Sequence, residues 1–355
     1  AGRVISETDA NKHTTRYRYG KTGLVSEITD ALGQKALFEY DALGNVTKIT
    51  APGNAVTQYA YDISGRLTTQ TDATGLVTEY GYDENSQLIS VVTNGNESLY
   101  EYDALGNVSS VTDAEGRCVK LAYDLNGNLT EIIYPDGTKD VTEYDALGRV
   151  VQSTPRTGLA TAYAYDESGN VVRMTQGEQT TAYEYDLLGR MVRQIAADGT
   201  ETAYAYDALG NLVGQTDELG NQTTFSYTAE SLLEQVTYAN GASQSLSYDL
   251  AGNIIGETDA EGNAKQYQYD KANRLIAVVD ELGGKTSYAY DAMDHIVQVT
   301  DALRHATKYT YDKDGNLTSE TDALGNRVQY AYTPEGWLSS VTKADGAVMT
   351  FEYDK

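Results

Sequence analysis

The sequence predicts an all-β fold made of tandem β-hairpin repeats of about 21 residues, coiled into a superhelical strip or a partial hollow shell. The first observation is a tyrosine that returns at a step of 21 residues, or of 20 in two places, along the whole chain. The second is the aspartate that follows fourteen of these seventeen tyrosines; the exceptions are Gly20, Thr228 and Thr333. So short a unit cannot bury an apolar face alone, so we expect one continuous array over residues 1–355.

The recurring tyrosines are Tyr19, Tyr40, Tyr61, Tyr82, Tyr102, Tyr123, Tyr144, Tyr165, Tyr185, Tyr206, Tyr227, Tyr248, Tyr269, Tyr290, Tyr311, Tyr332 and Tyr353. Each unit reads as two strand-length runs and two turns. In Asp41-Ala42-Leu43-Gly44 the aspartate can cap a type I turn, and the glycine can take the positive φ that closes a bulged hairpin. We call this the Tyr-Asp turn, and the turn at the other end of the hairpin, as at Asp217 to Gly220, the opposite turn. The predicted structural residues of the Tyr-Asp turns are Asp41, Gly44, Asp103, Gly106, Asp145, Gly148, Asp207 and Gly210.

The strand before each Tyr-Asp turn often carries a second aromatic residue two positions earlier, as in Tyr59 and Tyr61. Residues two apart share one face of a strand, so adjacent hairpins should align these rings into a ladder that forms the core. The predicted ladder comprises Tyr40, Tyr61, Tyr82, Tyr102, Tyr123, Tyr144, Tyr165, Tyr185, Tyr206, Tyr248, Tyr269, Tyr290 and Tyr311. In the other strand the apolar residues lie three apart, as in Val46 and Ile49. Either a bulge resets the face or both faces are partly covered.

Such a sheet, at about 4.8 Å per strand, would extend on the order of 160 Å, so twist and bulges should curve it. Its terminal strands, near Tyr17 and Tyr353, would leave backbone groups unpaired. We expect further repeats, another domain or another copy of the chain to cover them, the last by edge-to-edge self-association.

Composition narrows the classes of partner. The formal net charge of -26 disfavours nucleic acid and anionic lipid, because both are polyanions. No apolar run is long enough to insert into a membrane, and the first residues show no signal-peptide pattern. The one cysteine, Cys118, cannot form an intrachain disulfide. Both ends of the sequence fall inside the repeat, which reads as an excerpt from something longer.

The pattern Tyr-Asp-x-x-Gly followed by Thr-Asp-Ala-x-Gly or a close variant, as in Tyr206 to Leu212 with Thr216 to Gly220, and Tyr311 to Leu317 with Thr321 to Gly325, resembles the YD repeats of the Rhs family. The same repeats occur in Tc toxin cocoon subunits, wall-associated contact-dependent toxins and teneurins. This resemblance covers the whole chain. It implies a hollow β shell that encloses a toxin carried at the C-terminus of the polypeptide and is delivered by a bacterium. Such a shell needs more repeats than these, so this chain would be a fragment of it.

The family's other parts do not match this sequence. Relatives close the shell with a plug whose Asp-Pro motifs act in self-cleavage, and this sequence contains no Asp-Pro dipeptide. We therefore carry over the scaffold role and neither the protease nor the toxin activity. The predicted partners are the enclosed toxin domain and flanking repeats of the same polypeptide, and the predicted location is outside the producing bacterium, secreted or at its surface.

Candidate chemical sites all have a structural reading. His13, His295 and His305 fall at the position just after the turn glycine, which Asn occupies in many units, so no metal site is predicted. Rows of turn aspartates could instead collect calcium, or each could cap its own turn. Cys118 reads as a small apolar filler. Trp337 marks either a contact with the segment that follows or an isolated surface position. We predict no catalytic residue, no cofactor and no enzyme activity.

Two functions remain open from the sequence. The first is a non-enzymatic shell segment around a toxin. The second is a cell-surface module whose exposed tyrosines bind a glycan or a partner protein. The second aromatic row distinguishes the two functions: rings packed on the strands favour containment, and a solvent-facing stripe favours glycan binding.

Overall fold

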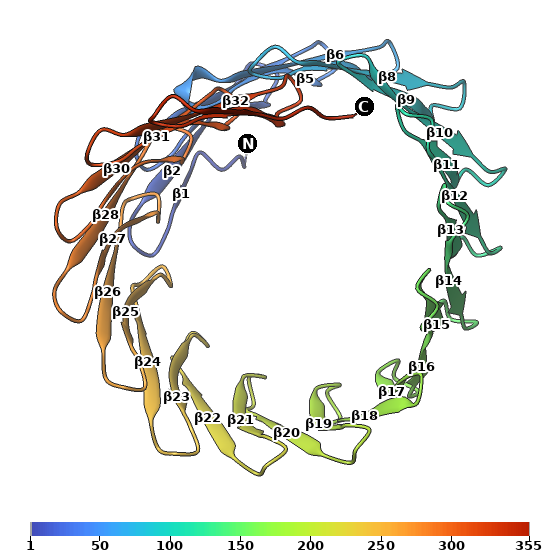
Figure 1. Ribbon diagram of the computed structural model, residues 1–355, viewed down its shortest axis with the longest axis vertical. Helices are drawn as coiled ribbons and strands as arrows, with labels where there is room; N and C mark the ends of the chain where they lie inside the picture. Colours follow the sequence, from blue (N-terminus) through green and yellow to red (C-terminus); the bar gives the residue numbers. More distant parts are fainter. Residues whose placement is uncertain (1, 355) are drawn as a thin grey trace. The chain divides into compact units, whose positions relative to one another are not determined.

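The computed structural model describes residues 2–354. Within this range it has 34 strands in one sheet and one short 3-10 helix, so the all-β prediction is confirmed. Strands that follow one another in sequence pair antiparallel, as in β4 with β5 and β5 with β6 (Figure 1). No helix of the described chain is long and apolar enough to span a bilayer.

The first half of the sheet comprises β1 Ser6–Thr8, β2 Thr14–Tyr19, β3 Val25–Thr29, β4 Lys35–Tyr40, β5 Val46–Thr50, the helix η1 Pro52–Asn54, β6 Val56–Tyr61, β7 Leu67–Thr71, β8 Val77–Tyr82, β9 Leu88–Thr93, β10 Asn96–Tyr102, β11 Val108–Thr112, β12 Cys118–Tyr123, β13 Leu129–Ile133, β14 Lys139–Tyr144, β15 Val150–Thr154, β16 Thr161–Tyr165 and β17 Val171–Gln176. The second half comprises β18 Gln179–Tyr185, β19 Met191–Ile195, β20 Glu201–Tyr206, β21 Leu212–Thr216, β22 Gln222–Tyr227, β23 Leu233–Thr237, β24 Ser243–Tyr248, β25 Ile254–Thr258, β26 Ala264–Tyr269, β27 Leu275–Val279, β28 Lys285–Tyr290, β29 Ile296–Thr300, β30 Ala306–Tyr311, β31 Leu317–Thr321, β32 Arg327–Tyr332, β33 Leu338–Thr342 and β34 Val348–Thr350. The terminal strands were predicted near Tyr17 and Tyr353. Tyr17 lies instead in the second strand, β2, and the last strand, β34, ends at Thr350.

A β-bulge at each Tyr-Asp hairpin explains the spacing of three that the sequence left open. In β4 and β5, Tyr40 pairs with Val46 and Glu39 pairs with Lys48, so Thr47 has no partner in the ladder. The extra residue places Val46 opposite Tyr40 and Ile49 opposite Phe38, on one face of the sheet. The same shift recurs one repeat later, between Ala60 and Tyr61. The structure contains the bulge, and all five residues of β5 are also half-buried, so side chains on both faces of this strand are partly covered.

The sheet has no second layer of secondary structure against it within the described residues, so few side chains are fully buried. The buried side chains are small: Ala55, Ala277, Val341, Ser110 and Ser319. Along β4, side chains alternate between exposed and half-buried, and Tyr40 belongs to the half-buried set. Stability must therefore come mainly from the backbone ladder, the turns and the half-buried tyrosine face, because there is no deep apolar core.

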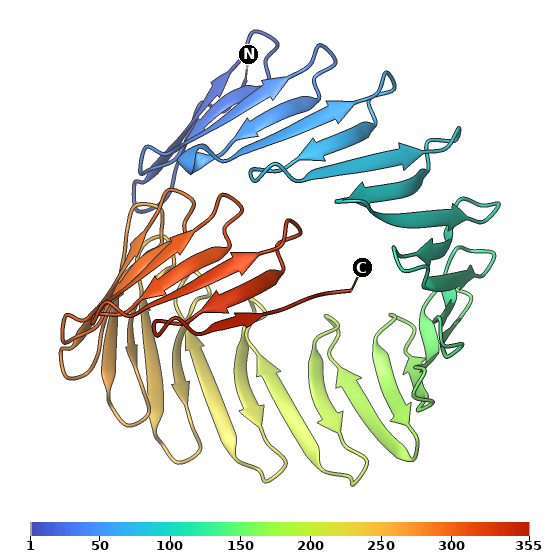
Figure 2. The same cartoon turned by 45° about the horizontal axis from the view of Figure 1, so that its top comes forward.

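The chain divides into two compact units. The first contains Ala1–Glu97, Ser247–Glu257 and Asn263–Lys355, and the second contains Ser98–Leu246 and Thr258–Gly262. Inside the first unit, segments that are far apart in sequence meet at their turns: the Asn11 amide donates to the Asp249 carboxylate at 2.9 Å. Figure 2 shows the early strands, in blue, beside the late strands, in orange.

Candidate functional site

The recurring element of this protein is the Tyr-Asp turn together with the tyrosine that precedes it. In the first such turn of the predicted set, the Asp41 amide donates to the carbonyl of Asn45 at 3.0 Å, and the Gly44 amide donates to the carbonyl of Asp41 at 3.2 Å. Gly44 has φ 93, a left-handed conformation that glycine adopts without a steric cost. The sequence folds this way because aspartate begins the turn and glycine ends it.

Both oxygens of the turn aspartate accept hydrogen bonds inside its own turn. Asp41 Oδ1 accepts from the backbone amides of Leu43 and Asn45, each at 2.9 Å, and Oδ2 accepts from the Asn45 side-chain amide at 2.9 Å. The bond from the Asn45 side-chain amide is the largest cause of the lowered pKa of Asp41. Asp103 and Asp207 make the same three bonds, each with the asparagine of its own turn.

In the turn that begins at Asp145, an arginine takes the place of the asparagine, and Arg149 Nε donates to Asp145 Oδ2 at 2.7 Å. The pKa of Asp145 is lowered, first by the bond from the Arg149 backbone amide. Where the aspartate is absent, Thr228 takes over with its hydroxyl, which accepts from the Glu230 and Leu232 amides at 3.2 and 3.3 Å. The capping position is therefore kept even in a repeat that departs from the Tyr-Asp pattern.

The predicted ladder tyrosines end the strand that leads into each Tyr-Asp turn, and their hydroxyls reach back to the preceding repeat. Tyr61 donates to the carbonyl of Val46 at 2.9 Å, and Tyr206 donates to the carbonyl of Met191 at 2.9 Å. The same bond, to the first residue of the preceding strand, is made by Tyr40, Tyr82, Tyr144, Tyr165, Tyr185, Tyr269, Tyr290 and Tyr311. Tyr102, Tyr123 and Tyr248 occupy the equivalent ends of β10, β12 and β24.

The hydroxyl bond of the tyrosine satisfies a backbone carbonyl that strand pairing leaves free. Strands β5 and β6 pair only from Thr50 with Val56 to Lys48 with Gln58. The carbonyl of Val46 lies beyond this paired stretch, and a backbone carbonyl without a partner is costly when it is shielded from water. The hydroxyl of Tyr61 supplies that partner and so joins β6 to the preceding strand β5 beyond their paired stretch.

A second contact also links successive repeats: the residue after the turn glycine lies over the tyrosine of the next repeat. The Arg149 guanidinium carbon is 4.5 Å from the centre of the Tyr165 ring, and that of Arg190 is 4.8 Å from the Tyr206 ring. At the equivalent position His295 stacks on Tyr311 with ring centres 4.6 Å apart. These contacts place an arginine or histidine side chain on the ladder ring, whereas the repeat pattern predicted contacts between tyrosine rings.

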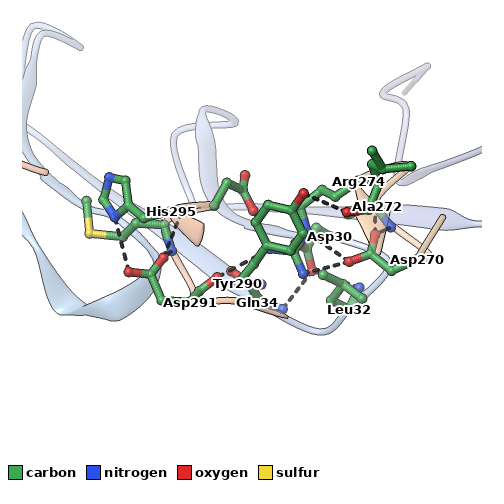
Figure 3. Close-up of polar contacts among 12 residues, drawn as sticks. Asp30, Leu32, Gln34, Asp270, Ala272, Arg274, Tyr290, Asp291 and His295 are labelled. Atoms are coloured by element: carbon green, nitrogen blue, oxygen red, sulfur yellow. Dashed lines mark hydrogen bonds and ion pairs between the residues drawn. The ribbon is translucent and has the colours of Figure 1, made fainter. Parts of the chain in front are cut away.

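Figure 3 shows two consecutive turns of this kind, with Asp270 and Arg274 in one and Asp291 and His295 in the other. Arg274 Nε donates to Asp270 Oδ2 at 2.8 Å, and its guanidinium lies 4.6 Å from the centre of the Tyr290 ring. Burial is the largest cause of the raised pKa of Tyr290. Along this row of turns, each aspartate carboxylate binds an arginine, histidine or asparagine side chain of its own turn. The arginine or histidine also lies on the tyrosine ring of the next repeat, so these contacts hold neighbouring strands together.

The three histidines occupy this same position after the turn. The rings of His13, His295 and His305 each direct Nδ1 at the aspartate of their own turn, at 3.3, 3.1 and 3.0 Å. Among the described residues, no three His, Cys, Asp or Glu side chains gather where they could hold a metal ion. Cys118 is half-buried at the start of β12. The ring of Trp337 meets Tyr353 edge-on, with ring centres 5.0 Å apart, so the tryptophan contacts its own chain.

A family model described as the RHS repeat matches most of this sequence. The matched residues are 1–35, 40–75, 64–98, 102–139, 144–181, 185–222, 206–243, 248–284, 269–306 and 311–348. The comparison with curated proteins found no match.

Among solved structures, the chain is similar to a crystal structure titled TcdB2-TccC3-Cdc42, with 17% identity and a TM-score of 0.79 over 94% of this chain and 22% of that one. A crystal structure of TcdB2-TccC3 without its hypervariable C-terminal region gives 16% identity and a TM-score of 0.80, covering 96% of this chain and 22% of that one. A Tc holotoxin pore from Photorhabdus luminescens gives 16% and 0.76, covering 94% and 21%. The chain thus spans about a fifth of these proteins, and the likeness concerns the fold.

Proposed function

Because this chain belongs to the RHS repeat family, we propose that it is a non-enzymatic segment of a shell wall that encloses a toxin domain of the same polypeptide. The observation that carries the proposal is one sheet that continues from β1 to β34, in which tyrosine hydroxyl bonds join most successive repeats. Such a sheet can separate an interior from solvent without a second layer. The fold likeness to Tc toxin structures supports the same role.

The second aromatic row also supports containment. Tyr59, Tyr163, Tyr204 and Tyr288 are half-buried on the sheet and are absent from the large exposed apolar side chains, which include Tyr238 and Trp337. Glycan recognition by an aromatic platform needs a row of exposed rings. No observation therefore favours the surface-recognition function over the wall.

Delivery outside the producing bacterium follows from this role. A wall around a toxin keeps the toxin inactive toward the producer and releases it elsewhere. The net charge of -26 suits a soluble carrier, because like-charged particles repel one another and stay dispersed.

Limited proteolysis tests the proposal in the full-length product that contains this chain. A domain outside the repeats should resist protease at neutral pH and be cut once the wall is unfolded by alkali. The same domain expressed alone, as the control, should be cut at both pH values. Equal cleavage of the domain in both contexts at neutral pH would contradict the enclosing role, as would a full-length product made only of repeats.

A further inference from the structure

Two side-chain bonds in the first unit join turns that lie far apart in the sequence. The Asn11 side-chain amide donates to the Asp249 carboxylate at 2.9 Å, and the Asn94 side-chain amide donates to the Glu335 carboxylate. Asn94 belongs to the turn between β9 and β10, and Glu335 belongs to the turn between β32 and β33. Neither bond is part of the backbone ladder, so the second contact depends on the chemistry of its two side chains.

The charged side chains around Asn94 are acidic. The pKa of Glu335 is lowered, with the bond from Asn94 as the largest cause, so this carboxylate is ionised at neutral pH. Asn94 also helps to line a cavity of about 660 Å³ together with Asp312 and Asp314. None of the described residues that line this cavity is a Lys, Arg or His. A carboxylate in place of the Asn94 amide would therefore face like charges, which repel one another.

Asn94 precedes Gly95, and an asparagine followed by glycine can lose its amide in water without an enzyme. The Gly95 nitrogen attacks Cγ of Asn94, the bond between Cγ and Nδ2 breaks, and ammonia leaves with the proton from the Gly95 nitrogen. Water then opens the cyclic imide to give aspartate or isoaspartate. Both residues are exposed, and a β-carbon placed on Gly95 would meet no atom within 4 Å, so nothing shields this reaction from water.

The sequence contains two other Asn-Gly pairs, and their turns hold the glycine nitrogen differently. In the pairs that begin at Asn126 and Asn240, the amides of Gly127 and Gly241 donate to a carbonyl of their own turn at 3.1 and 2.9 Å. The Gly95 amide makes no such bond within the described chain. A proton that is held in a hydrogen bond is harder to remove, so Gly95 carries the most available nucleophile of the three.

We propose that Asn94 is a site of slow spontaneous deamidation, which converts its hydrogen bond to Glu335 into a repulsion between two carboxylates. The product has no proton to donate at neutral pH, so the long-range contact loosens with time. The hairpin of β9 and β10 survives the change to aspartate, because Asp-Gly suits a two-residue type I′ turn as Asn-Gly does. The reaction is thus an ageing step that acts on the contact between distant turns and leaves the sheet intact.

Peptide mapping by mass spectrometry tests the chemistry. The wild-type chain is kept in mildly alkaline buffer, and the conversion of each of the three Asn-Gly pairs to the acid is followed over time. Conversion at Asn94 should be several times faster than at Asn126 or Asn240, which serve as controls within the same molecule. Conversion at Asn94 that is equal to or slower than at the other two would overturn the proposal.

Hydrogen–deuterium exchange in the peptide that contains residues 333–336 tests the consequence. Asn94→Asp should exchange several times faster there than the wild type. Asn240→Asp adds the same charge to a turn of the second unit and keeps the acceptor oxygen of the bond from the Ala242 amide, so this control should leave the peptide unchanged. Combining Asn94→Asp with Glu335→Gln should restore slow exchange, because the new amide can donate to the new carboxylate.

Circular dichroism establishes that the three variants keep the β structure of the wild type. Unchanged exchange at residues 333–336 in Asn94→Asp would overturn the proposal, because the contact would then not respond to the added charge. Equal acceleration in Asn240→Asp would also overturn it, since the effect would come from net charge alone. Failure of the combined variant to slow exchange would show that Glu335 is not the group that meets Asn94.

Discussion

The two ends of each hairpin share their turn chemistry and differ in how their strands are joined. Asp207 and Asp217 begin turns at opposite ends of β21, and each accepts bonds from two backbone amides and one asparagine amide. Only the Tyr-Asp end has the bulge and the tyrosine hydroxyl bond. Strands β21 and β22, which the opposite turn connects, pair without a shift in register. The tyrosine bonds therefore join successive repeats at the Tyr-Asp end of the hairpin.

The opposite end varies more freely. Both 20-residue steps of the repeat coincide with a shortened opposite turn, at Asn94-Gly95 and at Gly177-Glu178. Asn94 and Gly95 both have positive φ, 49 and 78, as a two-residue hairpin turn of type I′ requires. The Tyr-Asp turns of these repeats keep their full length. A residue can therefore be lost where no inter-repeat bond depends on it.

Alkaline pH should produce the largest effect, because it acts on several ladder tyrosines at once. The pKa values of Tyr61, Tyr290 and Tyr311 are raised above 10.0, with burial the largest cause, so the folded state holds these protons more tightly than the unfolded chain. Stability from this source is complete below pH 10 and is lost as pH rises through the folded values. Melting temperature and tyrosinate absorbance should change together above pH 10. A melting temperature that stays constant while the tyrosines ionise would contradict the fastening role.

Acid acts on both ends of the hairpin and so is the control for the alkaline experiment. The pKa values of Asp207 and Asp217 are both lowered from 3.8, with the asparagine side-chain bond as the largest cause. The stability that they contribute is present above pH 3.8 and is lost as pH falls through the folded values. Turn amides at the two ends should therefore lose protection together in acid.

Two glycines four residues apart offer the next test. Gly210, in the Tyr-Asp turn, has φ 93, so Gly210→Ala should destabilise the protein by about 1–2 kcal/mol. Gly214 lies inside β21, where an added β-carbon would meet the Ala205 β-carbon at an ordinary 3.6 Å. Gly214→Ala should stabilise it by about 0.5–1 kcal/mol, because alanine loses less backbone entropy on folding. Urea unfolding measures both, and changes of the same sign would contradict the turn geometry.

Two tyrosines on β20 give the smallest expected change in stability, and they separate the effect of the hydroxyl from that of the ring. Tyr206→Phe removes the bond to the Met191 carbonyl and should cost about 1 kcal/mol. Tyr204 lies on the same face two residues earlier and makes no hydroxyl bond within the described part of the chain, so Tyr204→Phe should cost much less. Equal costs in thermal or urea unfolding would show that ring packing, and not the hydroxyl, accounts for the role of the ladder.

The sequence allowed the strands, the hairpins and the turns to be predicted, because each depends on residues close together in the chain. Asp41 and Gly44 define their turn by local chemistry alone. The spacing of Val46 and Ile49 fitted two alternatives, because spacing alone does not distinguish a bulge from a sheet covered on both faces. The bulge required the strand register, and the partial burial of both faces of β5 required the side-chain positions.

Other features depend on long-range geometry. The hydroxyl of Tyr61 can reach the Val46 carbonyl because the backbone pairing between β5 and β6 stops before Val46. A nearly fixed separation, 15 residues in most repeats and 14 between Tyr185 and Val171, is the sequence signal that could have suggested it. The bond between Asn11 and Asp249 joins residues 238 positions apart in the sequence, which no local pattern reveals.

Hydrogen–deuterium exchange resolved to short peptides tests the fastening of repeats at the Tyr-Asp end most directly. The comparison is between the wild-type chain and Tyr206→Phe, in peptides around the acceptor strand β19 and the Tyr-Asp turn at Asp207, with the opposite turn at Asp217 as the internal reference. We predict faster exchange at β19 and the Tyr-Asp turn, and no change at the opposite turn. Unchanged exchange at β19, or equal acceleration at both turns, would contradict the account.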